Sequence, residues 1–169
     1  MPNPIVSILM GSDHDFKVMK EAGDILTSFG LPFEYTVTSA HRSPQRTADL
    51  AKTAETRGIK VIIVGAGKAA HLAGNVAAWT CLPVLGVPID ASLGGMDALL
   101  STVQMPGGVP VGTMGIGKSG AKNAALLAVQ ILALSDSDLM SKLHQYKERI
   151  AQEVEEKDRK LKSPKCNES

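Results

Sequence analysis

The chain has 169 residues, 44% of them hydrophobic, which suits one globular domain with a single core. Its net charge is only +1 and aromatic residues make up 4%, a balance that argues against a nucleic-acid-binding surface. The two cysteines lack metal-ligand spacing, which predicts free thiols in a reducing compartment. The first residues lack the features of a secretory signal, and the longest apolar run, 124–134, is too short to span a bilayer. We therefore expect a cytoplasmic protein that binds neither membranes nor nucleic acid.

Short apolar runs alternate along the chain with segments of helical periodicity. Most of the runs are apolar on both faces and end near glycine, serine or proline, which is typical of buried parallel strands, whereas the run at 33–38 alternates. Strands are predicted at 5–10, 33–38, 60–64, 83–87 and 109–114. Helices are predicted at about 13–29, 44–57, 69–80, 95–102 and 119–134. Pro83 and Pro88 are expected to keep the fourth strand short. Repeated β–α units with right-handed crossovers predict an α/β fold with three αβα layers around a parallel sheet of about five strands.

A long amphipathic helix is predicted after the last strand–helix unit, over residues 136–161. Its apolar residues form a narrow stripe among many charges: Leu139, Leu143, Tyr146, Ile150 and Val154. The helix could pack on its own domain, but residues 1–134 already form a complete domain. We therefore expect residues 135–162 to pack on a neighbouring subunit. Residues 163–169 are expected to form a disordered tail.

The loop after the first strand is a candidate anion site. Backbone N–H groups at a helix start, together with the Ser12 hydroxyl, can hold a phosphate. Asp15, one turn further on, can accept hydrogen bonds from ribose hydroxyls. Ordinary helix capping explains the same residues. The site interpretation gains support because other loops converge on the same edge of the sheet.

The loop after the second strand reads Ser39-Ala40-His41-Arg42. Arginine presents a planar group of donors that fits phosphate, and histidine transfers protons readily near neutral pH. A structural loop histidine and a surface arginine are the alternative. The small residue Ala40 and the flanking polar groups favour a functional loop.

The third loop carries Gly65-Ala66-Gly67-Lys68 and then His71. Its glycines allow a ligand to approach the backbone closely. The loop also matches a loose dinucleotide fingerprint with Asp90 downstream, but that fingerprint belongs after the first strand of its unit. We expect His71 to meet His41, because both histidine loops follow the carboxyl ends of strands, where ligand sites of parallel sheets form.

Residues 112–119 match the G-x-x-x-x-G-K-[ST] pattern of a P-loop. Gly112 falls inside a predicted strand, however, and no later strand can supply the magnesium-binding aspartate of such sites. Triphosphate binding is therefore not favoured. No histidine or cysteine cluster has metal-ligand spacing. The Gly-x-Ser-x-Gly motif of serine hydrolases is absent from the sequence, which argues against that class.

Taken together, these motifs resemble the family of 5-(carboxyamino)imidazole ribonucleotide mutases of bacterial purine biosynthesis. The resemblance covers Val6 to Leu134 and includes the motifs Met10-Gly11-Ser12 with Asp15, Ser39-Ala40-His41-Arg42, Gly65-Ala66-Gly67 with Ala69-Ala70-His71-Leu72, Leu85-Gly86-Val87-Pro88, Gln104-Met105-Pro106-Gly107-Gly108 and Lys122-Asn123-Ala124-Ala125-Leu126-Leu127. It implies a flavodoxin-like (Rossmann-like) subunit, a homo-octamer, and movement of a carboxylate from the exocyclic nitrogen to a ring carbon. It implies no metal or organic cofactor.

The resemblance also implies roles for individual residues. Ser12 and Arg42 would bind the phosphate and Asp15 the ribose, while residues 65–72 would surround the base and carboxylate. His41 would transfer protons, and His71 would orient the carboxylate or shape its loop. The substrate-binding residues are then Ser12, Asp15, Ser39, Ala40, Arg42, Gly67, Lys68 and Leu72.

A sister class carboxylates aminoimidazole ribonucleotide directly; it typically has lysine after the first histidine and lacks the second. Arg42 and His71 therefore favour the mutase class, with the direct carboxylase as the alternative. A non-enzymatic module that binds flavin or nucleotide is the alternative outside enzymes. Lys68 and Ala73 depart from the family's usual glycine and proline. The instability of the carbamate suggests transient contact with the ATP-dependent synthetase that makes it.

Overall fold

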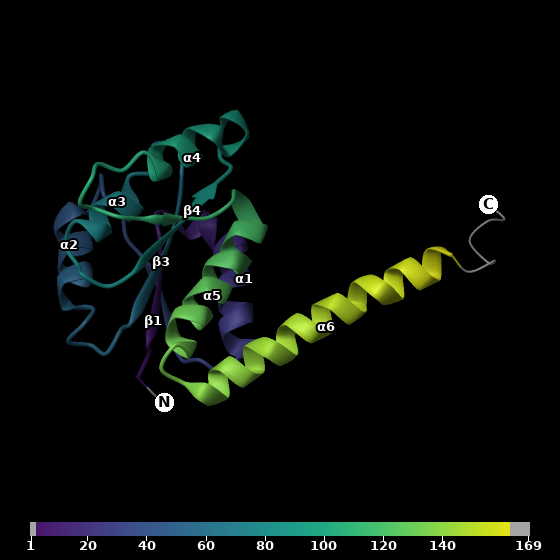
Figure 1. Cartoon of the computed structure of the whole chain (residues 1–169). Helices are drawn as coiled ribbons and strands as arrows, with labels where there is room; N and C mark the ends of the chain where they lie inside the picture. The colour runs from purple at the N-terminus through teal and green to yellow at the C-terminus, as the bar shows by residue number, and fades with distance from the viewer. Residues whose placement is uncertain (1–2, 163–169) are drawn as a thin grey trace. The chain divides into compact units, whose positions relative to one another are not determined.

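The computed structural model describes residues 3–162 and contains a five-stranded parallel sheet with helices on both faces (Figure 1). The strands are β1 (Val6–Met10), β2 (Phe33–Val37), β3 (Val61–Gly67), β4 (Val84–Ile89) and β5 (Gly112–Thr113). The helices are α1 (Phe16–Ser28), α2 (Pro44–Thr53), α3 (Leu72–Ala77), α4 (Met96–Val103), α5 (Gly117–Ala133) and α6 (Ser137–Leu161). The strand order β2-β1-β3-β4-β5 is that of flavodoxin-like folds, so the predicted fold class is confirmed.

The two faces of the sheet are covered by different helices. Leu9, Ile62 and Val64 pack in one buried core with residues of α2 and α3. The next residue of β3, Gly65, points to the other face, where a Cβ would meet the Met19 side chain of α1. Side chains of α1 and α5 are joined by ion pairs on that face. The carboxyl ends of the strands are thus held between two helical layers.

The described residues form two compact units, divided after Val129. In the second unit, Asp136 caps α6 by accepting a hydrogen bond from the Leu139 N–H at 2.9 Å. Leu139 and Leu143 are buried, whereas Ile150 and Val154 further along α6 are exposed. Within residues 3–162, no helix is long and apolar enough to cross a membrane. The predicted tail, 163–169, lies outside the described residues.

The middle strands are longer than predicted. Gly65, Ala66 and Gly67 were expected in a loop, yet they continue β3 and pair with β4 as far as Ile89. Pro88 was expected to end the fourth strand, but it lies inside β4. On its other side β4 pairs with β5 only at Leu85 and Gly86, so no neighbour there requires an N–H from the proline.

The fifth strand is shorter than predicted. Residues 109–114 were expected to pair, but only Gly112–Thr113 form a strand. A turn over 107–108 and Pro110 occupy the segment before it, and proline cannot donate to a ladder. On this side β4 therefore has ladder partners only at Leu85 and Gly86.

Candidate active site

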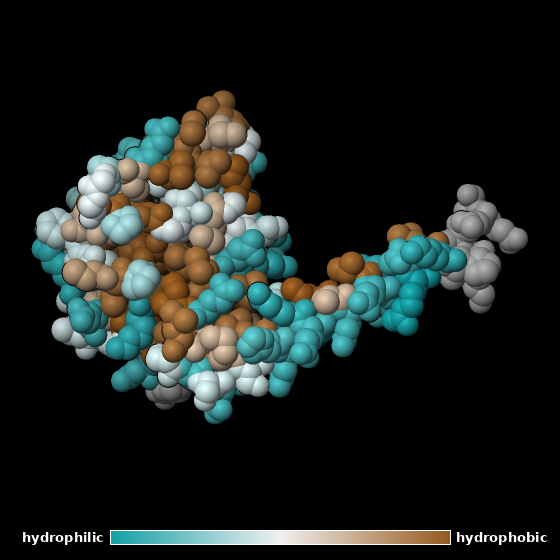
Figure 2. All heavy atoms as spheres, viewed as in Figure 1, coloured by the Kyte–Doolittle hydropathy of each residue, from teal (hydrophilic) through white to brown (hydrophobic). Residues whose placement is uncertain are grey.

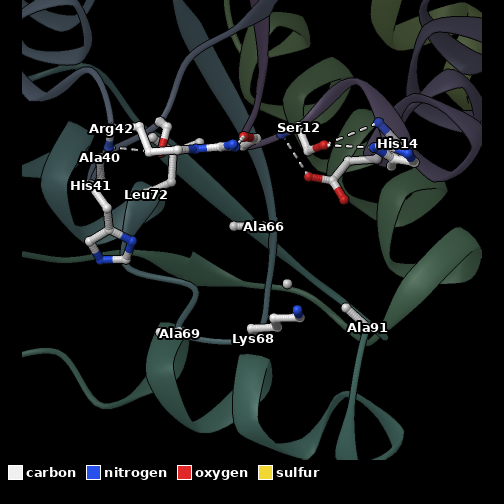
Figure 3. Close-up of a pocket in the computed structure, with 14 residues that line it drawn as sticks. Ser12, His14, Ala40, His41, Arg42, Ala66, Lys68, Ala69, Leu72 and Ala91 are labelled. Atoms are coloured by element: carbon white, nitrogen blue, oxygen red, sulfur yellow. Dashed lines mark hydrogen bonds between the residues drawn. The ribbon is translucent and has the colours of Figure 1, made fainter.

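A cavity of about 610 Å³ opens at the carboxyl ends of β1, β2 and β3 (Figure 3). Ligands of open parallel sheets bind at this edge. The lining residues are Gly11, Ser12, His14 and Asp15 after β1; Ser39, Ala40, His41 and Arg42 after β2; Ala66, Gly67, Lys68, Ala69 and Leu72 at and after the end of β3; and Ala91 after β4. All the predicted site residues except His71 are among them.

The loop after β1 closes on itself around Ser12. The Ser12 N–H donates to Asp15 Oδ2 at 3.0 Å, and the His14 N–H donates to Ser12 Oγ at 3.3 Å. This is the helix cap that the sequence offered as the alternative interpretation. The residues of this cap, Ser12 and Asp15, also line the cavity.

Burial changes the titration of the Asp15 carboxyl. Partial desolvation raises the pKa of Asp15, and the hydrogen bond from the Ser12 N–H offsets this only in part. The partly buried environment of Asp15 therefore disfavours the charged form of its carboxyl group. Carboxyl groups with a shifted pKa are common at functional sites.

We expect Asp15→Asn to be at least as stable as the wild type at neutral pH. The pKa of Asp15 is higher folded than unfolded, so the folded chain binds more protons and the wild type loses stability as pH rises through that interval. Asparagine keeps an acceptor for the Ser12 N–H and removes the charge. Urea unfolding over a pH series should show the advantage of the variant vanishing in acid. A variant less stable than the wild type at pH 7 would contradict the prediction.

Arg42 connects the second loop to the first. Its Nη2 donates to the Gly11 carbonyl oxygen at 3.2 Å, and its backbone N–H donates to Ser39 Oγ at 3.2 Å. In Figure 3 the guanidinium extends across the cavity toward the Ser12 loop. The group keeps further N–H donors for an anion placed between Arg42 and Ser12.

The two histidines meet, as expected, but only one of them lines the cavity. His41 Nε2 lies 2.8 Å from His71 Nδ1, with ring centroids 4.9 Å apart and ring planes at 81°. One of these nitrogens must carry the shared proton and the other must accept it. His71 is the N-cap residue of α3 and contacts His41 instead of the cavity. It is therefore placed to orient the His41 ring.

The floor of the cavity is backbone. A Cβ on Gly67 would come within 3.0 Å of the Ala91 Cβ and 3.1 Å of the Ile89 carbonyl oxygen. Only glycine fits without displacing strand β4, and its absence of a side chain leaves the strand surface open to a flat ligand. The sequence predicted close approach here but assigned it to a loop; the structure assigns it to a strand end.

Lys68 adopts a backbone conformation that favours glycine, with φ of +55°. For a residue with a Cβ this left-handed conformation costs about 1–2 kcal/mol. The Lys68 carbonyl oxygen accepts a hydrogen bond from the Ala70 N–H at 2.8 Å, which fixes the turn that leads to His71. Lys68 therefore lies at the cavity in a locally strained backbone conformation.

His14 and Ala91 line the cavity but were not predicted as site residues. His14 Nδ1 lies 3.1 Å from Ser12 Oγ, within the capping loop already recognised as a candidate site. Its position two residues after Ser12, in the same loop, could have predicted that His14 lines the cavity. Ala91 follows β4 and carries no chemical group, so only the strand order places it at the cavity.

The P-loop pattern has a structural explanation. Gly112 lies in β5 against the Leu85 side chain, and Gly117 has a φ of +75° at the start of α5. Lys118 Nζ pairs with Glu21 Oε1 at 3.2 Å instead of facing a phosphate loop. Across residues 3–162 no group of three or more His, Cys, Asp or Glu side chains could hold a metal ion.

The fold and the cavity define the class of protein. It is a flavodoxin-like α/β protein whose strand ends bring a histidine, an arginine, a lysine and a half-buried carboxylate to one cavity, with a second histidine in contact with the first. Residues 5–153 match the family model described as AIR carboxylase. The chain belongs to the AIR carboxylase family.

Named relatives are similar over most of their length. An N5-carboxyaminoimidazole ribonucleotide mutase of Pyrococcus horikoshii is 54% identical, over 94% of this chain and 89% of the relative. The protein of the same name from Bacillus subtilis is 57% identical, over 89% of this chain and 94% of the relative. Among solved structures, Treponema denticola PurE superimposes with a TM-score of 0.85 at 31% identity, covering 95% of this chain and 99% of that one.

Proposed function

We propose that the chain is an isomerase of purine biosynthesis, converting 5-(carboxyamino)imidazole ribonucleotide to 5-amino-4-imidazolecarboxylate ribonucleotide. Relatives of that mutase name at 54–57% identity support the assignment. The observation that carries it within the site is the contact between His41 Nε2 and His71 Nδ1, next to Arg42. The second histidine and the arginine are the features that separate the mutase from a direct carboxylase.

The cavity offers a place for each part of such a nucleotide. Arg42 and Ser12 face each other across one end and suit the phosphate. Asp15 suits the ribose hydroxyls, since a carboxylate accepts from both. The base and carboxylate would lie against the remaining site residues, namely Ser39, Ala40, Gly67, Lys68 and Leu72.

The reaction needs two proton transfers and no redox change. Protonation of the exocyclic nitrogen breaks the C–N bond and releases carbon dioxide, leaving the free amine. The ring carbon then forms a bond to carbon dioxide that is still held beside it, a case of catalysis by proximity. Loss of the proton from that carbon restores the aromatic ring. His41 gives the first proton and takes the second, so the enzyme ends as it began.

His41 can perform both steps from one position. Its Nε2 is engaged with His71, so Nδ1 is the nitrogen left for the substrate in this arrangement. His71 fixes the orientation and the tautomer of the His41 ring, as hydrogen-bond partners of catalytic histidines commonly do. We therefore assign His41 as the catalytic residue and His71 as the residue that positions it.

One assay separates the mutase from its alternatives. Purified protein is given the carbamate in one reaction and the free amine with bicarbonate in another, and the ring-carboxylated product is followed. The mutase should act on the carbamate at low bicarbonate. Turnover only of the free amine with bicarbonate would indicate the direct carboxylase, and no turnover with either would leave a binding module.

We also propose that the chain forms a homo-octamer in which α6 packs on a neighbouring subunit. The exposed apolar residues Ile150 and Val154 continue the stripe of α6. A second apolar group, Met96, Leu100 and Val103, is exposed on α4, where brown surface gathers in Figure 2. Apolar surface of this kind is typical of subunit contacts.

A chain ending at Leu134 is expected to form a smaller assembly than the full chain. Removing α6 removes its apolar contacts while leaving every strand and the cavity in place. Size-exclusion chromatography with light scattering measures the mass. The full-length double variant Ile150→Arg/Val154→Arg should behave in the same way. An unchanged mass in both would contradict packing of α6 between subunits.

A cytoplasmic location and a transient contact with the ATP-dependent carbamate synthetase complete the proposal. The exposed free thiol of Cys81 supports a reducing compartment. The contact is supported by chemistry, because a carbamate loses carbon dioxide readily in water and benefits from short transfer. We propose no membrane or nucleic-acid partner.

A further inference from the structure

Lys68 is a second cation at the cavity, besides Arg42, and belongs to a different wall. Arg42 follows β2 and is hydrogen-bonded to the Gly11 carbonyl, whereas Lys68 follows β3 beside the backbone floor at Gly67. In Figure 3 their side chains lie on opposite sides of Ala66 and both extend across the cavity. The cavity therefore carries two separate positive positions.

The Lys68 ammonium is not neutralised by a direct partner. Among residues 3–162 no carboxylate lies within ion-pair distance of its Nζ. Asp97, in the first turn of α4, feels the Lys68 charge without pairing with it: the Ser92 hydroxyl holds the pKa of Asp97 low, and the Lys68 charge lowers it slightly further. The Lys68 side chain is thus exposed at the cavity and available to a ligand.

The proposed substrate carries two anionic groups at its two ends, the phosphate and the carboxylate. If Arg42 and Ser12 take the phosphate, the base extends toward the floor at Gly67, and its carboxylate comes to the side of Lys68. We propose that Lys68 binds the carboxylate, so that the cavity selects carboxylated nucleotides over aminoimidazole ribonucleotide. This inference rests on the proposed function, which supplies the ligand.

The contact has a kinetic consequence. Carbon dioxide is neutral, so the ion pair with Lys68 exists in the substrate and the product but weakens as carbon dioxide leaves or joins. An interaction stronger in the ground state than in the transition state lowers KM without raising kcat. Removing Lys68 should therefore raise KM and leave kcat undiminished.

The test compares two ligands that differ only in the carboxylate. Calorimetry measures Kd for the ring-carboxylated product and for aminoimidazole ribonucleotide, with wild type, Lys68→Gly and Lys68→Met. Each variant should bind the carboxylated ligand about tenfold more weakly, as expected for one charge-assisted contact at an exposed site, with unchanged affinity for the other. Lys60→Met, which removes the same charge just before the opposite end of β3, should change neither Kd.

Several results would overturn the inference. An equal loss of affinity for both ligands would mean that Lys68 contacts the phosphate or acts only through its long-range charge. An unchanged affinity for both ligands would mean that Lys68 does not contact the carboxylate. A fall in kcat at unchanged affinity would place Lys68 in the chemical steps. A loss in Lys68→Gly without one in Lys68→Met would trace the effect to loop conformation. Failure of the wild type to convert the carbamate would defeat the proposed function separately, because ligand affinities are measured without turnover.

Discussion

Replacing His41 with asparagine is expected to lower kcat by about a hundredfold to ten-thousandfold while leaving nucleotide affinity within a few-fold of wild type. Asparagine retains polar groups near the position of the ring but cannot carry a proton between nitrogen and carbon. Steady-state rates with the carbamate and calorimetric titration with aminoimidazole ribonucleotide separate the two effects.

Two further histidine variants sharpen this result. His144 lies on the exposed surface of α6, so the control variant His144→Asn should keep wild-type turnover. His71→Asn should lower kcat by about tenfold, because it removes the contact to His41 Nε2 and leaves the proton carrier in place. Near-normal turnover of His41→Asn would refute the assignment of His41 as the proton carrier.

Gly120→Ala is expected to destabilise the fold by about 3 kcal/mol or more, a loss at the upper end for overpacked interiors. Gly120 is buried in α5, and a Cβ there would collide with the carbonyl group of Gly115. The obstacle is backbone, so no side chain can rotate away. Thermal unfolding should show a midpoint lower by roughly 6–12 °C for a domain of this size.

The control for this prediction is Ser119→Ala, on the exposed side of the same helix. It should change stability by less than about 0.5 kcal/mol. Glycine to alanine ordinarily stabilises a helix by about 1 kcal/mol. A stabilised Gly120→Ala would therefore show that helix propensity outweighs the contact with Gly115, against our expectation.

Sequence patterns predicted the three layers and the parallel sheet, because buried parallel strands are mostly continuous apolar runs, whereas the flavodoxin-like order was implied by the family resemblance. They failed where pairing depends on neighbours. Gly65–Gly67 look like a loop in the sequence, yet β4 offers them partners and they remain in β3. Residues 109–114 look like a strand, yet only Gly112–Thr113 find a partner. Local propensity cannot report which segments the fold brings alongside.

The sequence predicted those site residues that follow strand ends, because the carboxyl ends of parallel strands meet at one edge of the sheet. Ser12, His41 and Arg42 are placed there by topology alone, and the structure brings them to one cavity. The contact of His41 with His71 follows a turn through Lys68, whose positive φ was signalled only by the glycine that the family usually has at this position. Ala91 reaches the cavity only because β4 lies beside β3.

The backbone floor at Gly67 also limits how this cavity can diverge. A surface of main-chain atoms presents the same peptide groups whatever the surrounding sequence, and a Cβ at Gly67 would press on Ala91 and Ile89. A flat ring lying against this surface would therefore meet the same peptide groups through extensive sequence change. Differences in selectivity would have to come from the residues that border the floor, such as the exposed positions 68 and 91.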